Sequence, residues 1–399
     1  MPIGRVKTPT LALVVRRERE LAAFKPIDYF TVKILYTHPN GIFWATWQPT
    51  DEQKGLDPDG RLINKAVADE LINRLQAGPE GVVKSVTKSK KKDVQRLPPV
   101  LVIITGIGGK GFFYDPQTVL DTAQKLYEKK LTTYPPRSDC EYLPPNQYGD
   151  RIAILKNLES SGDEKLSKWA SGADCNIRSR AWNEKKITAH HAIIPTTVAC
   201  NVTTLSEEER NIYFLISQAY LAQFYGEHVY EQTKITVEQC KEEFVANGRV
   251  VIEEGWKGLY KRQKSKSSSD NSDEPDLTDE SGAEASPKKD AVEEADHLPA
   301  VKKNDTVQYT DSTIDAKQTK PPSRFTPSTL LQAMKEIHKF VKNEDLKKQL
   351  KAVSGIGTEA TRANIIDELI SRGFMKTSGG KNRFCPRRKR GVSLGGCAA

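Results

Sequence analysis

Two stretches near the N-terminus alternate apolar and polar residues with the two-residue period of a β-strand. They are "YFTVKILYTH" (29–38) and "IFWATWQP" (42–49), and both are rich in aromatic and β-branched side chains. The Pro-Asn-Gly sequence at 39–41 supplies turn residues between them, so the pattern predicts a β-hairpin. The segment "HVYEQTKITVEQCKEEFVANGRVVIEEGW" (228–256) predicts further strands and turns.

In other segments the apolar residues recur every three or four positions, which is the spacing of a helix with one buried face. This spacing predicts helices at 66–78 and 207–226, and a last helix that follows "GIGTEATR" and stops at Gly373. A helix over 115–128 opens with Asp115 as cap and a first-turn proline, and another begins at Thr326-Pro327. Their predicted inward residues are Val119, Leu120, Ala123, Leu126 and Tyr127 in the first, and Leu330, Leu331, Met334, Ile337, Phe340 and Val341 in the second.

Composition separates two further segments from these elements. Residues 85–99 form a basic segment that leads to a Pro-Pro boundary, where a second compact region starts. Residues 262–296 show no periodicity and almost no large apolar side chain, so they predict a disordered acidic linker. The pattern as a whole predicts an α/β, multidomain protein.

The overall composition excludes several classes of protein. Hydrophobic residues make up 37% and charged residues 28% of the 399, which is typical of a soluble globular protein. No run of eighteen apolar residues occurs, and the N-terminus has no signal-peptide core, so we expect a cytoplasmic protein with no membrane partner. The six cysteines form no close pair, which predicts free thiols rather than disulfides or a zinc site.

The net charge of +9 is unevenly distributed. Residues 261–300 carry a local charge of −5, so the rest of the chain carries +14. A basic body is the electrostatic footprint of a nucleic-acid binder, although charge alone does not separate specific from non-specific binding.

The segment "KLTTYPPRSDCEYLP" (130–144) holds Tyr134 between two threonines and two prolines, with Arg137 close behind. A phenol with a pKa near 10 is a poor nucleophile unless a cation or a base lowers the cost of its anion. An adjacent guanidinium does so, and it also neutralises a phosphoryl transition state. Tyr134 is therefore either a nucleophile directed at a phosphate or an aromatic that packs at a helix exit.

Two other segments contain candidate binding groups. "ITAHHAIIPTT" (187–197) carries His190 and His191, which point in different directions on any regular element, so a two-histidine metal site is not expected. One of them could contact a phosphate, or both could be satisfied within the fold. "GIGTEATRANIIDELISRG" (355–373) places two glycines and a threonine cap at a helix start, which is either a phosphate cradle with Thr358, Thr361 and Arg362 or an ordinary glycine turn.

"VLVIITGIGGKG" (100–111) contains the glycine spacing of a dinucleotide-binding loop after an apolar strand. The rest of that signature fails, because no strand ending in an acidic residue follows at the right distance. Nucleotide-dependent oxidoreduction is therefore only an alternative here.

Several of these stretches together resemble the bacterial type IA DNA topoisomerases, most closely those called topoisomerase III. The resemblance spans roughly residues 3 to 375, in order. The segments that carry it are "IGRVKTPTLALVVRRERE" (3–20), "LYEKKLTTYP-RSDCEYLP" (126–144 apart from one extra proline), "KKITAHHAIIPT" (185–196), "KPPSRFTPSTLLQAM" (320–334) and "GIGTEATRANIIDELISRGF" (355–374).

The resemblance implies a toroidal molecule with a hole for DNA and a tyrosine nucleophile. Tyr134 would attack a single-stranded phosphodiester, leaving a 5′-phosphotyrosyl bond and a free 3′-hydroxyl, and the break would be resealed after strand passage. Arg137 and His190 correspond to the arginine and the histidine beside that tyrosine. The implied DNA-contacting residues are Arg5, Lys7, Thr10, Ser138, His191, Thr358, Thr361 and Arg362.

The resemblance also implies a division of the chain into domains. A helical DNA-binding base would comprise 1–27 and 326–399, the latter with an atypical basic tail. A strand-rich arch would comprise 28–97, 225–261 and return strands at 297–325. The tyrosine domain would be 98–224, and the linker 262–296.

Three departures from the family pattern qualify these expectations. The family's Toprim domain, which carries the Mg²⁺ ligands, precedes the residues matched here, so we expect the chain to be a fragment that acts on DNA, with a separate Toprim-containing chain as a further partner. Pro135 and Pro136 place one extra proline before Arg137, and this shifts the guanidinium on a stiff turn. Residues 100–113 and 383–399 look like out-of-frame stretches. The alternative is a catalytically inactive remnant that binds single-stranded DNA.

Overall fold

The computed structural model of the chain divides into two compact units, each assembled from segments that are far apart in sequence. Unit 1 comprises Met1–Phe24, Val94–Gly226 and Pro322–Ala399, and unit 2 comprises Lys25–Asp93 and Glu227–Pro321. The structure describes residues 4–50, 52–98, 114, 116–133, 140–187, 190–261, 294–295, 297–352, 355–378 and 383–386. The predicted linker at 262–296 therefore lies almost wholly outside the described residues.

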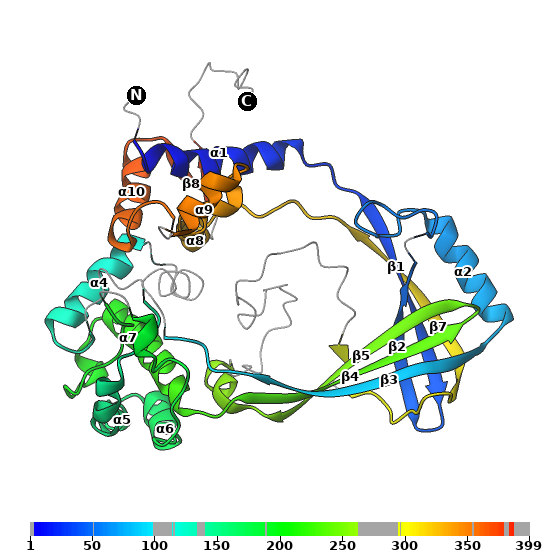
Figure 1. Ribbon diagram of the computed structural model, residues 1–399, viewed down its shortest axis with the longest axis horizontal. Helices are drawn as coiled ribbons and strands as arrows, with labels where there is room; N and C mark the ends of the chain where they lie inside the picture. The colour runs from blue at the N-terminus through cyan, green and yellow to red at the C-terminus, as the bar shows by residue number, and fades with distance from the viewer. Residues whose placement is uncertain are drawn as a thin grey trace, which may run out of the picture. The chain divides into compact units, whose positions relative to one another are not determined.

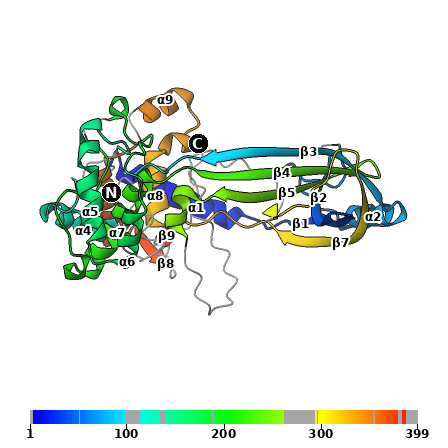
Figure 2. The same ribbon diagram turned by 90° about the horizontal axis from the view of Figure 1, so that it is seen from below.

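Unit 2 is built on a sheet of long antiparallel strands, which run side by side in Figure 2. Strand β2 pairs not only with β1 but also with β5, through Trp47 and Phe244, so the sheet closes on itself. The described strands follow the order β2-β1-β7-β3-β4-β5-β6. Their bounds are Asp28–His38 (β1), Gly41–Gln48 (β2), Glu80–Asp93 (β3), His228–Gln239 (β4), Glu242–Glu253 (β5), Glu294–Ala295 (β6) and Thr306–Gln318 (β7).

The hairpins of unit 2 match the sequence pattern. β1 and β2 pair up to His38 opposite Gly41, which confirms the first predicted hairpin. Gly41 has a φ of +139°, a conformation that L-residues rarely adopt, so the glycine of the turn has a backbone role. β4 and β5 form a second hairpin, which confirms the strands predicted at 228–256, and Cys240 and Lys241 turn the chain with positive φ.

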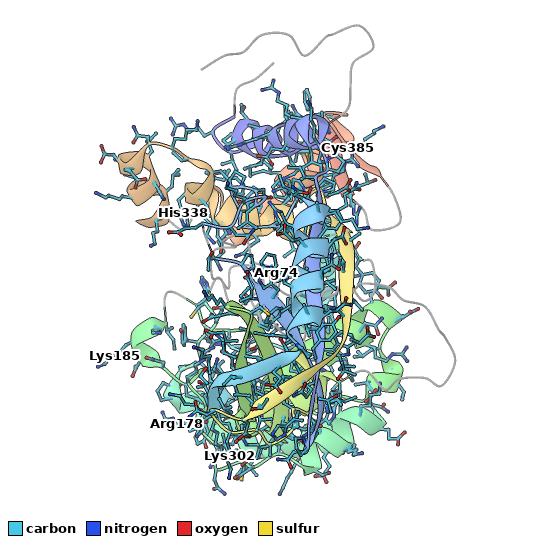
Figure 3. The ribbon with its side chains drawn as sticks, turned by 90° about the vertical axis from the view of Figure 1, so that its right-hand side faces the viewer. Arg74, Arg178, Lys185, Lys302, His338 and Cys385 are labelled. Atoms are coloured by element: carbon cyan, nitrogen blue, oxygen red, sulfur yellow. The ribbon has the colours of Figure 1, made fainter. Side chains whose placement is uncertain are left out.

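The core of unit 2 lies between the sheet and helix α2 (Lys65–Ala77), which confirms the predicted helix at 66–78 to within one residue (Figure 1). The hydroxyl and indole N–H groups of buried aromatic side chains form hydrogen bonds there. Tyr36 Oη donates to Gln239 Oε1 at 2.8 Å, and Trp47 Nε1 donates to Glu242 at 2.9 Å. Arg74 of α2, labelled in Figure 3, also pairs with Glu242, at 2.8 Å. These partners offset the cost of burying hydroxyl and indole groups.

The larger part of the basic segment at 85–99 belongs to strand β3. The sequence did not predict this strand, because lysine is uncommon in β-strands. Three lysines of β3, two of them within this segment, lie beside glutamates at or next to β4. The ion pairs are Lys84–Glu238 at 2.8 Å, Lys88–Glu231 at 4.0 Å and Lys92–Glu227 at 3.1 Å. Part of this positive charge is therefore paired within the sheet, so the segment gives only weak support for nucleic-acid binding.

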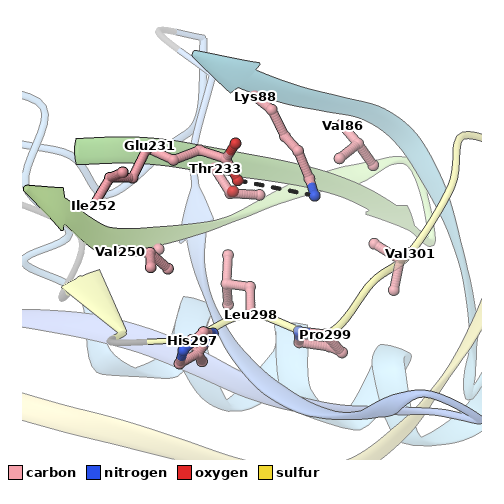
Figure 4. Close-up of a pocket in the computed structure, with 11 residues that line it drawn as sticks. Val86, Lys88, Glu231, Thr233, Val250, Ile252, His297, Leu298, Pro299 and Val301 are labelled. Carbon is pink, nitrogen blue, oxygen red and sulfur yellow. Dashed lines mark ion pairs between the residues drawn. The ribbon is translucent and has the colours of Figure 1, made fainter. Parts of the chain in front are cut away.

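A pocket of about 300 Å³ lies between strands β3 to β5 and the segment at 297–301 (Figure 4). Val86, Val250 and Leu298 supply apolar walls, and the Lys88–Glu231 ion pair crosses one side. Leu298 lies so close to the sheet that a Cβ added to Gly248 would come within 2.8 Å of its Cγ. The glycine thus lets the segment pack against β5.

Unit 1 is mainly helical, with a small hairpin near its C-terminal end (Figure 1). None of its described helices, nor those of unit 2, is long and apolar enough to cross a membrane. The bounds are Lys7–Ala23 (α1), Pro116–Glu128 (α4), Arg151–Glu159 (α5), Glu164–Ser171 (α6), Glu207–Leu221 (α7), Pro327–Lys335 (α8), Glu344–Ala352 (α9), Glu359–Ser371 (α10), Met375–Ser378 (β8) and Arg383–Pro386 (β9).

Two predicted helices of unit 1 need correction. α4 has its predicted bounds, but Tyr127 is 39% exposed and Thr122 is buried in its place. Successive helical residues are about 100° apart, so Val119, Thr122, Ala123 and Leu126 share one face and Tyr127 turns away from it. The helix predicted at 207–226 ends at Leu221 and continues as a 3₁₀ turn, Ala222–Phe224.

The C-terminal helices also differ in part from the prediction. Thr326 caps α8 as predicted, through Thr329, but α8 ends at Lys335, and a 3₁₀ turn, Ile337–Phe340, follows it. The charged helix α9 was not predicted. Gly373 ends α10 with a φ of +72°, as predicted. Residues 383–386 of the stretch that looks out of frame form β9, and Phe384 of β9 is buried and donates its N–H to Phe325 O.

Glu209 connects α7 to Lys129, the residue directly after α4, and gives unit 1 a pH-dependent stabilisation. Its carboxylate accepts from the Ser206 N–H and lies 2.7 Å from Lys129 Nζ, and the lysine holds the pKa of this buried carboxyl below its usual value. A depressed pKa stabilises the fold above the unfolded-state value of about 4.3 and loses that effect as the pH falls through the folded-state value.

We expect Glu209→Gln to lower the free energy of unfolding at pH 7 by about 1–2 kcal/mol, through loss of a charge-assisted pair. The difference from the parent protein should shrink on acidification below about pH 4. Urea unfolding at both pH values measures it, with the exposed Glu207→Gln of the same helix as control. An equal difference at both pH values would contradict the assignment.

Candidate active site

The predicted nucleophile has to be approached through its neighbours in the chain. Tyr134, Arg137 and Ser138 lie outside the described residues, as do Asp115 and the glycines at 106–111. The described chain stops at Thr133 and resumes at Cys140, and the residues on both sides of this gap make hydrogen bonds within the fold. The candidate site is therefore built from the segments that flank Tyr134.

Both flanks hydrogen-bond to the segment that follows the two histidines. On the N-terminal side, the Thr133 N–H donates to Ile194 O at 2.9 Å, and Thr133 Oγ1 donates to Ala192 O at 3.2 Å. On the C-terminal side, the Ala192 N–H donates to Tyr142 O at 2.9 Å. Ala192 is thus bonded to residues on both sides of the predicted nucleophile, and it follows His190 by two positions. The fold brings the tyrosine and histidine motifs together although more than fifty residues separate them in sequence.

Both histidines are half-buried, and the ring of His191 is held at two atoms. Its Nδ1 lies 2.8 Å from Ala192 O, and its Nε2 lies 3.0 Å from the side-chain nitrogen of Gln147. These contacts use both ring nitrogens within the protein. Among the described residues no group of three His, Cys, Asp or Glu side chains could hold a metal ion, so the predicted Mg²⁺ has no fitting ligand set there.

Cations lie beside the C-terminal flank. Lys186 Nζ donates to Tyr142 Oη at 3.1 Å and lies 4.9 Å from the centre of the tyrosine ring. Further along, Arg151 stacks on Tyr148, with its guanidinium carbon 4.1 Å from the ring centre. Arg178 is exposed near the same ring, and Figure 3 shows Arg178 and Lys185 projecting from unit 1. Such cations stabilise an anionic ligand through charge and hydrogen bonds.

The second predicted cluster surrounds the turn before α10. Gly355 and Gly357 have φ of +90° and +70°. Thr358 is the N-cap of α10: its N–H donates to Thr361 Oγ1 at 2.9 Å, and the two hydroxyl oxygens lie 3.0 Å apart. Arg362 is buried, and its Nε donates to Ile356 O at 3.0 Å, so it contacts the turn directly. The guanidinium therefore supports the shape of the proposed cradle.

The N-terminal candidates lie next to this turn. A Cβ on Gly357 would come within 3.3 Å of Val6, which precedes α1. Lys7 pairs with Glu368 of α10 at 2.5 Å, and Thr10 is buried and donates to Val6 O at 2.8 Å. Arg5 is exposed. Lys7 and Thr10 thus lie in one group with Thr358, Thr361 and Arg362, and the two histidines lie with the flanks of Tyr134 in another.

A model of the protein family described as DNA topoisomerase matches residues 1–394. The chain belongs to this DNA topoisomerase family. The match includes the glycines at 106–111, so the oxidoreductase alternative is set aside. The family predicted from the sequence is confirmed.

Individual relatives agree with the family match. DNA topoisomerase 3 of Vibrio cholerae is 36% identical over 383 residues, which cover 94% of this chain and 55% of the relative. DNA topoisomerase 3 of Salmonella typhimurium is 37% identical, over 95% of this chain and 54% of the relative. The chain therefore spans about half the length of these topoisomerases.

A solved structure supports the fold. Full-length topoisomerase I from Thermotoga maritima superimposes with a TM-score of 0.61 at 20% identity, covering 96% of this chain and 53% of that one. The predicted mixture of helical and strand-rich parts in a topoisomerase fold is confirmed.

Sequence reasoning missed the residues that hold the site together. Gln147, Tyr148 and Arg151 follow the tyrosine motif closely, in "PPNQYGDR" (144–151), where the prolines and glycine indicate only a turn. Tyr142 lies within the quoted motif, and its link to Ala192 is made by the backbone carbonyl, which every residue carries. A pairing of this kind leaves no signal in the sequence.

Proposed function

We propose that this chain forms the strand-cleaving part of a type IA DNA topoisomerase, with Tyr134 as the nucleophile toward single-stranded DNA. The phenolate oxygen of Tyr134 would form a bond to phosphorus while the bond from phosphorus to the 3′-oxygen breaks. The phenolic proton is lost to a base, and the departing 3′-oxygen gains a proton. Resealing is the reverse transfer, so the energy of the phosphodiester is kept in the tyrosyl ester and no nucleotide is consumed.

One observation carries this proposal: both flanks of Tyr134 bond to Ala192, directly after the two histidines, within a chain that matches the family over residues 1–394. Two anchors on one backbone fix where the intervening tyrosine segment starts and ends. Holding a nucleophile near its target replaces a costly encounter with a pre-arranged one. Arg137 and His190 are proposed to neutralise the phosphate while charge builds on it.

We propose that the ligands of Mg²⁺ belong to another domain and not to the residues described here. No described cluster of this chain fits the ion. We therefore assign no step of this chain's chemistry to a metal, and we propose that a Toprim domain supplies the Mg²⁺ site. Single-stranded DNA is the proposed substrate, with the group around Gly357 and Lys7 as a second contact.

A trapping experiment tests the function. Cleavage leaves the protein on the 5′-phosphate of the downstream strand, so the oligonucleotide is labelled at its 3′ end and incubated with the chain, a purified Toprim domain and Mg²⁺. Denaturation should then release a labelled band that migrates with the protein and disappears after protease treatment. A 5′-labelled copy of the same oligonucleotide should give no such band, because that fragment leaves with a free hydroxyl.

The second candidate function is DNA binding without cleavage, which the +14 charge outside residues 261–300 favours. Fluorescence anisotropy with the same oligonucleotide measures it. Salt-dependent binding combined with no adduct, in the presence of an active Toprim domain, would support this alternative and contradict the enzyme.

A further inference from the structure

The hydrogen bonds of His191 determine which of its nitrogens carries the proton. A carbonyl oxygen only accepts, so at 2.8 Å from Ala192 O the ring must donate through Nδ1–H. In the neutral ring Nε2 is then the acceptor, and the atom 3.0 Å away is the side-chain nitrogen of Gln147, which is a donor. The two contacts agree with each other, and together they fix both the tautomer and the plane of the ring.

Gln147 is itself held by a rigid support. It lies in the 3₁₀ turn Pro145–Asp150, and its N–H donates to Pro144 O at 3.1 Å. The next residue, Tyr148, donates to Cys175 O at 2.9 Å and is covered by Arg151, whose Nε donates to the same carbonyl at 2.8 Å. Because this turn is held in place, the Gln147 side chain loses little conformational freedom when it forms its hydrogen bond.

We propose that Gln147 is a positioning residue for DNA cleavage: its amide fixes the neutral, Nδ1-protonated form of His191 and thereby the backbone at Ala192 that anchors both flanks of Tyr134. The role in cleavage rests on the proposed function, whereas the hydrogen bond stands independently of it. His191 Nδ1 and Thr133 Oγ1 both donate to Ala192 O, so turning the imidazole disturbs an acceptor shared with the tyrosine flank.

The other end of the amide supports this role. Gln147 Oε1 is buried and has no hydrogen-bond partner in the described structure. A buried carbonyl oxygen without a partner is costly, so an amide serving only to fill space would be replaced by an apolar side chain at little loss. The amide nitrogen contact to His191 is what distinguishes glutamine from methionine at this position.

The tautomer can be measured directly, without any assay of activity. With ¹⁵N-labelled histidine, long-range proton–nitrogen spectra distinguish a protonated from an unprotonated ring nitrogen, and a His191→Gln variant assigns the signals. In the neutral ring of the parent protein we expect His191 to carry its proton on Nδ1. Gln147→Met has nearly the same shape and no donor, so it should raise the fraction protonated on Nε2. A parent ring that is neutral and protonated on Nε2 would overturn the proposal.

The effect on cleavage is measured as the rate at which the covalent adduct forms in a single turnover. We expect Gln147→Met to slow it by about tenfold to a hundredfold, as small misplacements of reacting groups do, with oligonucleotide affinity unchanged. Gln117→Met is the matched control, because Gln117 also has one buried amide oxygen without a partner and one amide hydrogen bond, to Asp121 at 2.7 Å on α4. The control should show parental rates and an unchanged His191 signal.

The outcomes separate the two proposals. A tautomer change in Gln147→Met together with an unchanged cleavage rate would overturn the positioning role and leave the enzyme intact. If the parent protein itself forms no adduct with an active Toprim domain, the proposed function fails and the cleavage role falls with it, whereas the spectra still decide whether Gln147 fixes His191. Should Gln147→Met not fold, the parent spectrum alone decides the hydrogen bond.

Discussion

Tyr134→Phe is expected to abolish the covalent adduct between this chain and a 3′-labelled oligonucleotide. The change removes a single oxygen and keeps the aromatic ring, so an aromatic that only packs would tolerate it. A nucleophile would not, because phenylalanine has no atom that can form an ester with phosphorus. Single-turnover rates should fall by at least about a thousandfold, to the limit of detection, while affinity for the oligonucleotide stays within about twofold because the phosphate contacts proposed elsewhere are unchanged.

Tyr142→Phe is the matched control for this prediction. Tyr142 follows the proposed nucleophile by eight residues, its hydroxyl accepts from Lys186, and its backbone carbonyl accepts from the Ala192 N–H. The backbone link survives the change, so the adduct should still form. An adduct that persists in Tyr134→Phe would assign the nucleophile to another residue, and loss of the adduct in both variants would indicate a general disturbance of the site.

How far the sequence predicts this fold depends on whether an element is determined locally. The hairpin at 29–49, the α2 helix and the cap at Thr326 have local causes: a strand period with a glycine turn, a helical period, and a hydroxyl before a proline. Each of them is found where it was predicted, to within a residue or so. The tyrosine, histidine and glycine motifs were likewise located from their own residues, although their roles stay predictions.

The rest depends on contacts between distant segments. β3 reads as a basic segment in isolation, and it is a strand because its backbone pairs along most of its length with β4, which begins about 135 residues later. Tyr127 fits an apolar stripe by composition, yet the packing of α4 turns it outward. The contact of Gln147 with His191 joins two half-buried side chains 44 residues apart and has no periodic signature. Pairings of this kind become visible only once the chain is folded.

Gly355→Ala is expected to destabilise unit 1 more than any other single-methyl change considered. Gly355 is buried with a φ of +90°, and an added Cβ would lie 2.3 Å from the carbonyl oxygens of both Met334 and Lys335. These oxygens belong to the end of α8, where the Ile356 N–H also donates to Met334 O at 3.0 Å. Backbone atoms cannot turn aside as side chains do, so the turn would have to separate from the helix.

We expect a loss of about 3–5 kcal/mol in the free energy of unfolding for Gly355→Ala, the sum of an unfavourable backbone conformation and a forced displacement. Gly357→Ala should cost about 1–2 kcal/mol, because its φ of +70° is also unfavourable but its nearest neighbour, at 3.3 Å, is a Val6 methyl that can shift. Gly149→Ala is the control, since nothing lies within 4 Å of its added Cβ, and it should stay within about 0.5 kcal/mol of the parent protein. Urea unfolding followed by far-ultraviolet circular dichroism measures the series.

If Gly355→Ala were as stable as Gly149→Ala, the turn would not be packed on α8. Because Arg362 binds Ile356 O in that turn, the cradle proposed for DNA depends on the same contact.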